Sequence, residues 1–230
     1  FEVMKTRDYM TVFIDNIRLY KRNIASVKPE DEKYVNALMS RSDLLELCGN
    51  FPQMKFIIFT NLEDTPIDDF IINRIPENVA CISAVNAITH NDKVIPAPYG
   101  VQRRMNPSDD RIEQLTQYME HVPSKPRGLL YVSHNESSNA KRQGIKNLFY
   151  DKDWAEVNEQ RVPYNIFLYN LSGSKFMICP EGNAIDCHRN WEVLYMRRVP
   201  IMTRDPYLEV LFKNYPVLFV DKYSDITEEL

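Results

Sequence analysis

The stretch FMICPEGNAIDCHRNWEVLYMRRVPIM, residues 176–202, decides the fold that we expect for this chain. It begins with an apolar run that ends at Pro180, and it closes on a second apolar run at 199–202. A turn with one glycine and an apolar helix separate the two runs. A strand, a helix and a second strand in this order form the crossover unit of parallel sheets. The stretch therefore predicts an α/β fold.

Two charged residues, Arg189 and Glu192, stand inside this otherwise apolar helix. They are three positions apart and therefore share a helix face. Charged side chains are rarely buried unless they are paired or functional, so the pair is either a structural ion pair or part of a binding site. We expect Asp186 to cap the helix, which would aim the free amides of its first turn at the loop PEGN. Such a helix end is a typical anion site.

The alternation of strands and helices extends in both directions from this stretch. In the C-terminal half, strands are expected at 128–133 and in the runs KFMICP, VPIMT and VLFVD, with helices at 139–149 and 164–172. In the N-terminal half, strands are expected at KFIIFTN (55–61), VACISAV (79–85) and KVIPAPYG (93–100), before a helix at 108–122 that Ser108 caps. Each half therefore predicts a parallel sheet with crossover helices.

The segment PSKPRG, 123–128, interrupts this alternation and predicts a domain boundary. We expect an N-terminal α/β domain at 1–122 and a C-terminal one at 128–230. Two such domains joined by a short linker commonly bind a ligand in the cleft between them, at the carboxyl ends of the strands.

The composition narrows the class of protein. Hydrophobic residues make up 44% and charged residues 26% of the 230 residues, as in ordinary globular proteins. The formal net charge of −4 argues against broad binding to nucleic acid. The four cysteines are scattered, which favours reduced thiols and a cytoplasmic location. No apolar run reaches the roughly 18 residues of a transmembrane helix, so we expect no transmembrane segment.

The central stretch resembles the donor-binding half of exostosin-like glycosyltransferases, a kind of enzyme that also occurs in large algal viruses and bacteria. The shared pattern is an apolar strand closing on C-P-x-G, the helix D-x-x-R-x-W-E-x-L, a basic turn and an apolar strand opening with V-P-I. The match runs from Asn170 to Asp205 and is looser elsewhere. The matching positions, in order and spacing, are Phe176–Pro180, Gly182, Arg189, Glu192 and Val199–Ile201.

This resemblance implies the GT-B architecture, in which two Rossmann-like domains flank a cleft and the C-terminal domain holds the nucleotide sugar. It implies that Glu192 accepts hydrogen bonds from the ribose hydroxyls and that Arg189, with the helix amides, lies near the diphosphate. Pro180, Gly182 and Asn183 would contact the nucleotide sugar from the loop. The chemistry suits these residue types, because a carboxylate accepts from two vicinal hydroxyls and a guanidinium can bind phosphate oxygens bidentately.

The segment SHNESSNAKRQGIKNLF, 133–149, fits the same interpretation. The family commonly has a strand, a polar loop and an arginine on the following helix, close to the leaving diphosphate. Arg142 matches that position, with Ser133, Asn135 and Lys141 as helpers. The alternative is a solvated helix start with ordinary basic residues.

Two residues of the N-terminal half are candidates for the base that activates the acceptor hydroxyl. Asp64 follows the apolar run KFIIFTN, and His90 lies in the polar loop THND. The segments FIIFTNLEDTPID and NAITHNDKVIPAPYGVQR weakly resemble the acceptor half of related enzymes. The alternative for Asp64 is that it only caps a helix beginning near Pro66.

Metal and dinucleotide sites are not supported by the sequence. Asp151 and Asp153 form the D-x-D pattern that GT-A glycosyltransferases use for a divalent metal, but they follow an expected helix rather than a strand. Cys179, Cys187 and His188 lack the fourth ligand of a zinc site. No G-x-G-x-x-G or G-x-x-x-x-G-K-[ST] occurs, and we expect no bound cofactor.

The resemblance therefore implies an inverting glycosyltransferase, and we expect it to be metal-independent. It would move a sugar from a nucleotide sugar, in particular a UDP-sugar, to a hydroxyl of a glycan acceptor. The alternative is a non-catalytic two-domain α/β protein that binds a nucleotide or a sugar.

Overall fold

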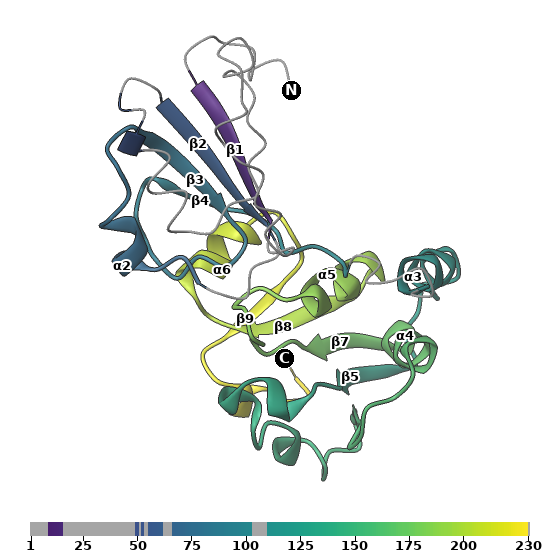
Figure 1. The fold of residues 1–230 in the computed structure, drawn as a ribbon. Helices are drawn as coiled ribbons and strands as arrows, with labels where there is room; N and C mark the ends of the chain where they lie inside the picture. Colours follow the sequence, from purple (N-terminus) through teal and green to yellow (C-terminus); the bar gives the residue numbers. More distant parts are fainter. Residues whose placement is uncertain are drawn as a thin grey trace. The chain divides into compact units, whose positions relative to one another are not determined.

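The structure is a computed structural model that describes residues 9–15, 49–50, 52, 55–61, 66–102 and 110–229. The chain forms two compact units, Phe1–Pro98 and Tyr99–Leu230 (Figure 1). Both contain a sheet in which all the strands are parallel. The predicted α/β class with parallel sheets is thereby confirmed.

The first unit contains a four-stranded sheet with the order β1-β2-β3-β4. Phe56 and Ile58 are fully buried on β2, which pairs with strands on both sides, as the apolar run KFIIFTN predicts. Asp68 caps the short helix α2 by accepting a hydrogen bond from the Ile71 amide at 3.0 Å. The elements are β1 (Tyr9–Asp15), β2 (Lys55–Asn61), α2 (Asp69–Ile72), β3 (Val79–Ala84) and β4 (Val94–Pro96).

The second unit contains a five-stranded sheet with the order β6-β5-β7-β8-β9. Its strands are β5 (Gly128–Val132), β6 (Ala155–Val157), β7 (Ser174–Ile178), β8 (Val199–Thr203) and β9 (Leu218–Val220). Its α-helices are α3 (Arg111–Glu120), α4 (Tyr164–Gly173), α5 (His188–Tyr195) and α6 (Pro206–Leu211). Its described residues also form the 3-10 helices η4 (Glu136–Ser138), η5 (Ala140–Arg142), η6 (Lys146–Leu148) and η7 (Tyr223–Asp225).

The segment that predicts a domain boundary, 123–128, lies inside the second unit. Arg127 donates from its backbone amide to the Gly173 carbonyl at 2.7 Å, and buried Arg198 donates to the Pro123 carbonyl at 2.7 Å. The prolines therefore shape a packed loop, and α3 belongs with the second sheet rather than the first. The division falls instead between Pro98 and Tyr99. The expected cap of α3, Ser108, lies outside the described residues.

The helix expected at 139–149 is replaced by two separate 3-10 turns, η5 and η6. The chain becomes extended at Gln143, with ψ of 132°, and Gly144 then adopts a positive φ of 77°. Glycine reaches this region without the penalty that a side chain imposes, so the break is encoded at Gly144. The prediction of one helix over 139–149 is therefore wrong.

Alternate residues of the central strands bury opposite faces of the second sheet. One face forms a core cluster with the 3-10 turns and the residues after β9: Leu130, Val132, Ile145, Phe149, Ile178, Ile201, Val220, Tyr223 and Ile226. On the other face, Tyr131 packs against Phe167 of α4, with ring centroids 6.0 Å apart. None of the helices in the described part of the chain has the length and apolar character needed to cross a membrane.

Candidate functional site

The strand order of the second unit creates a topological switch point between β5 and β7. The chain leaves β5 toward β6 on one side and returns to β7 on the other side. In open parallel sheets, the crevice for a ligand lies at the carboxyl ends of the two strands at this point. The loops that begin at Ser133 and at Cys179 leave the sheet there. Most of the residues expected to bind a nucleotide sugar lie on these two loops or on α5.

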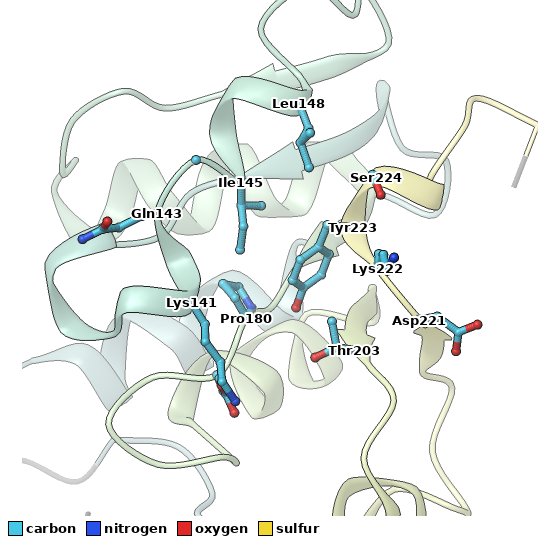
Figure 2. Close-up of a pocket in the computed structure, with 12 residues that line it drawn as sticks. Lys141, Gln143, Ile145, Leu148, Pro180, Thr203, Asp221, Lys222, Tyr223 and Ser224 are labelled. Carbon is cyan, nitrogen blue, oxygen red and sulfur yellow. The ribbon is translucent and has the colours of Figure 1, made fainter.

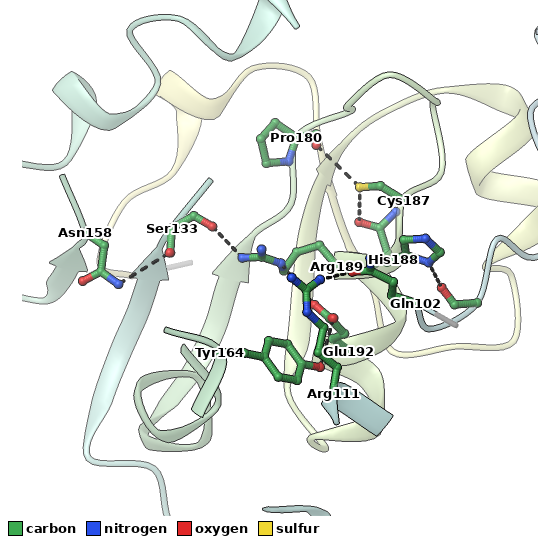
Figure 3. Close-up of polar contacts among 12 residues, drawn as sticks. Gln102, Arg111, Ser133, Asn158, Tyr164, Pro180, Cys187, His188, Arg189 and Glu192 are labelled. Carbon is green, nitrogen blue, oxygen red and sulfur yellow. Dashed lines mark hydrogen bonds and ion pairs between the residues drawn. The ribbon is translucent and has the colours of Figure 1, made fainter. Parts of the chain in front are cut away.

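Arg189 connects α5 to the end of β5 (Figure 3). Its NH1 group donates to the Ser133 carbonyl at 2.7 Å, and its guanidinium lies over the Phe167 ring, 4.0 Å from the centroid. The Arg189 side chain keeps 32% of its surface exposed. A protein-bound cation that reaches solvent at the switch point can meet an anionic ligand.

Glu192 is buried beneath Arg189, with 4% of the residue exposed. Its Oε2 lies 3.3 Å from the Nε of Arg189, and its Oε1 accepts a hydrogen bond from the Tyr164 hydroxyl at 3.0 Å. Burial and the neighbouring Glu192 carboxylate raise the pKa of Tyr164, so Tyr164 remains a donor. The structural ion pair considered from the sequence is thus formed, and a ribose could reach Oε1 only by displacing the Tyr164 hydroxyl.

Arg142 holds the turn that follows β7. Its Nε donates to the Glu181 carbonyl at 2.7 Å and its NH2 to the Pro180 carbonyl at 2.9 Å. Its NH1 donates to the Asn135 carbonyl at 3.2 Å and to the Ser138 hydroxyl at 2.8 Å. The guanidinium therefore ties the two switch-point loops together. Its observed contacts are with the protein backbone, so its expected contact with a diphosphate stays a prediction.

Gly182 leaves room for the close approach of the Arg142 guanidinium. A Cβ at this position would lie 2.9 Å from the Arg142 NH2 group. The Gly182 carbonyl accepts a hydrogen bond from the Asn139 side chain at 2.7 Å, which adds a second tie between the loops. Asn183 follows on the same loop and is exposed. Packing against Arg142 thus accounts for the glycine of the C-P-x-G pattern.

His134 is a residue of this site that the sequence interpretation missed. It directly follows Ser133 and is 9% exposed. Its Nε2 lies 3.3 Å from the Arg142 carbonyl, and its buried Nδ1 has no hydrogen-bond partner among the described residues. Burial, with Arg142 and other cations nearby, lowers the pKa of His134 to about 4, so the ring is neutral at pH 7. Because a carbonyl only accepts, Nε2 carries the proton and Nδ1 is a free acceptor.

Asp186 is fully buried and does not cap α5; the residue at the N-cap position is Cys187, so that prediction is wrong. Its carboxylate accepts from the Tyr99 amide at 2.7 Å, from the Asn190 side chain at 2.9 Å and from the Trp191 indole at 2.8 Å. Burial raises the pKa of Asp186 to about 6, against the opposing effect of these donors. A carboxylate of the protein therefore already lies close to the beginning of α5.

The thiols near the turn are unreactive in character. Burial raises the pKa of Cys179, and burial with the Asp186 charge raises that of Cys187 to about 11. Asp151 and Asp153 are exposed, and Asp151 pairs with Lys152 at 3.1 Å. Within the described ranges, three or more histidine, cysteine or acidic side chains do not gather into a potential metal site.

Both candidate bases, Asp64 and His90, belong to the first unit, whereas the site described above lies in the second. Asp64 lies outside the described residues, so its role stays a prediction. His90 is exposed in the first unit, in the segment between β3 and β4. Its expected role likewise stays a prediction.

Neither a scan against protein-family models nor a comparison with curated proteins finds a match for this chain.

Proposed function

We propose that the second unit binds a nucleotide sugar at the carboxyl ends of β5 and β7, and that the chain is a glycosyltransferase resembling the exostosin-like enzymes. The observation that carries this proposal is the convergence at the switch point. Segments far apart in the sequence meet there: Arg189 of α5 donates to the Ser133 carbonyl after β5, and Arg142 donates to the Glu181 carbonyl after β7. Open parallel sheets of this order bind nucleotides at the same place.

The diphosphate is assigned to the exposed side of Arg189. The ion pair with Glu192 and the contact with Phe167 fix the guanidinium before any ligand arrives. A preorganised cation loses little freedom on binding, which favours affinity. The Glu192 carboxylate then takes the ribose hydroxyls in place of the Tyr164 hydroxyl. Arg142 and Gly182 act on the ligand through the shape of the turn.

The proposed reaction inverts the anomeric centre and uses no metal. The acceptor oxygen attacks the anomeric carbon, the bond from that carbon to the diphosphate oxygen breaks, and the nucleoside diphosphate leaves with the bonding electrons. A base takes the proton of the acceptor hydroxyl, with Asp64 proposed ahead of His90. The cation at Arg189 stabilises the charge that develops on the departing diphosphate, an effect that is greatest in the transition state. We place the protein in the cytoplasm.

A non-catalytic binding protein is the second candidate. The observation that favours it is the full engagement of Glu192 and Arg142 with protein groups, which is typical of a structural network. Tight binding of UDP without hydrolysis or transfer of any sugar from UDP-glucose, UDP-galactose or UDP-xylose would select this candidate.

The test compares UDP with uridine in isothermal titration calorimetry. Arg189→Gln removes the cation, so UDP affinity should fall about tenfold or more while uridine affinity changes little. Arg189→Lys keeps the charge and should recover part of the loss. Arg197→Gln is the matched control, because Arg197 is exposed just beyond the opposite end of α5.

Equal losses for UDP and uridine would mean that Arg189 is structural, since uridine carries no phosphate. Thermal unfolding of each variant accompanies the titration, because removing Arg189 leaves Glu192 buried without its cation. If the wild type binds neither UDP nor GDP, the proposed function fails.

A further inference from the structure

A pocket of about 370 Å³ opens next to the switch point, beyond the turn that Arg142 holds (Figure 2). Ligand sites for molecules of this size commonly fall between 300 and 1,000 Å³. The segment with η5 and η6 forms one side, and the last residue of β8 with the residues after β9 forms the other. The pocket is lined by Lys141, Gln143, Gly144, Ile145, Leu148, Pro180, Glu181, Thr203, Asp221, Lys222, Tyr223 and Ser224.

The hydroxyl of Tyr223 has no hydrogen-bond partner among the described residues, although Tyr223 is only 8% exposed. Figure 2 shows this hydroxyl on the side of the ring that faces Pro180 and Thr203. Burial, with Cys179 and Cys187 nearby, raises the pKa of Tyr223, so the group stays a neutral hydroxyl. The backbone and side-chain polar atoms of Thr203 oppose this shift because they approach the hydroxyl, but they do not meet the geometry of a hydrogen bond. A buried hydroxyl without a hydrogen-bond partner is energetically unfavourable. A ligand that offers a polar group here would remove that cost.

The charges around the pocket balance each other. The charged side chains that line it are Lys141, Lys222, Glu181 and Asp221, two of each sign. Lys141 pairs with Glu181 at 2.5 Å, and Asp221 lies 3.3 Å from Arg204, which is outside the lining. The remaining walls combine apolar groups, Ile145, Leu148 and Pro180, with hydroxyl and amide side chains. A neutral ring with several hydroxyls matches this lining, because its C–H faces can lie on the apolar walls while its hydroxyls meet donors and acceptors of both kinds. An anionic ligand would find no excess positive charge.

We propose that this pocket takes the uncharged sugar ring of the donor. The proposal rests on the proposed function, and it adds where the sugar lies and which class of sugar is used. Pro180 and Glu181 line the pocket, and their carbonyls accept the hydrogen bonds from Arg142 on the switch-point side. A diphosphate at Arg189 would therefore lie across the turn from the sugar. Tyr223 and Thr203 become the residues that recognise the sugar.

The test is the difference between UDP-sugars and UDP in their response to Tyr223→Phe. This variant removes one hydroxyl and keeps the ring. The affinity for UDP-glucose or UDP-galactose, measured by calorimetry, should fall about three- to tenfold, and the affinity for UDP should not change. Thr203→Val should act in the same direction. Tyr215→Phe is the matched control, because Tyr215 is exposed and does not line the pocket.

The thermal stability of Tyr223→Phe distinguishes this proposal from a structural role of the hydroxyl. Because the Tyr223 hydroxyl is unpaired, Tyr223→Phe should leave the unfolding midpoint of the ligand-free protein unchanged or slightly raised. A clearly lower midpoint would mean that the hydroxyl bonds to the protein, and the proposal would be overturned. If Tyr223→Phe weakens the binding of UDP and of UDP-sugars equally, or weakens neither, the sugar pocket is also refuted. The proposed function would still stand in that case, provided that the wild type binds UDP. UDP-glucuronate binding as tightly as UDP-glucose would refute the preference for an uncharged sugar.

Discussion

Asp186 makes the stability of the protein depend on pH in a direction opposite to that of most carboxylates. Its pKa in the folded protein is about 6, against an ordinary value of 3.8. The folded state therefore holds a proton that the unfolded chain has released between these pH values. At 1.36 kcal/mol for each pKa unit, Asp186 lowers the free energy of unfolding by about 3 kcal/mol as the pH rises from well below 3.8 to well above 6.

The perturbation is Asp186→Asn, which cannot ionise. The variant loses hydrogen bonds at every pH, because an amide nitrogen replaces one of the two carboxylate oxygens and cannot accept from the donors on that side. The informative quantity is the difference in unfolding free energy between wild type and variant, from urea unfolding at several pH values. This difference should be about 2.5 kcal/mol larger near pH 4 than near pH 7.5.

Asp151→Asn is the matched control. Asp151 is an exposed carboxylate whose pKa is lowered by its hydrogen bond and charge interaction with Lys152. The difference in unfolding free energy between wild type and Asp151→Asn should therefore increase as the pH rises. If the difference in unfolding free energy between wild type and Asp186→Asn is constant, or increases with pH, the pKa of Asp186 is not raised. The hydrogen-bond donors would then lower that pKa at least as much as burial raises it, and the reasoning would be refuted.

Three further predictions concern the proposed activity. Glu192→Gln should weaken UDP binding by roughly 1–3 kcal/mol, the range for a hydrogen bond to a charged group, and unchanged calorimetric binding would remove the ribose assignment. Turnover should persist in EDTA; a complete loss that manganese or magnesium restores would return Asp151 and Asp153 as metal ligands. Asp64→Asn should cut turnover by roughly 100-fold with UDP affinity intact. Near-normal transfer in that variant, with loss in His90→Ala, would reverse the order of the two candidate bases.

The alternation of apolar runs and helices was sufficient to predict the central part of the fold. The strands β7 and β8 and the helix α5 lie where the stretch 176–202 places them, because buried parallel strands are short, apolar and separated by crossover segments. The spacing of Arg189 and Glu192 also predicted that the two side chains would share a face, and they form an ion pair.

Features that depend on long-range contacts were not predicted. Asp186 leaves the cap position because the distant Tyr99 amide and the Trp191 indole draw its carboxylate into the interior. The Arg142 guanidinium is aimed by carbonyls that follow β7, and no local pattern specifies them. Gly144 was the signal against a helix at 139–149, and the short sequence SHN after β5 was the signal that could have identified His134.

The core cluster that covers one face of the second sheet has a consequence for the order in which the protein can fold during synthesis. Leu130 and Val132 enter early, whereas Val220, Tyr223 and Ile226 come from the last part of the chain. Chains emerge from the ribosome at about 5–20 residues per second. The apolar face of β5 is therefore exposed for several seconds before its cover is made. During that interval the nascent chain offers an apolar surface to chaperones and to other unfinished chains.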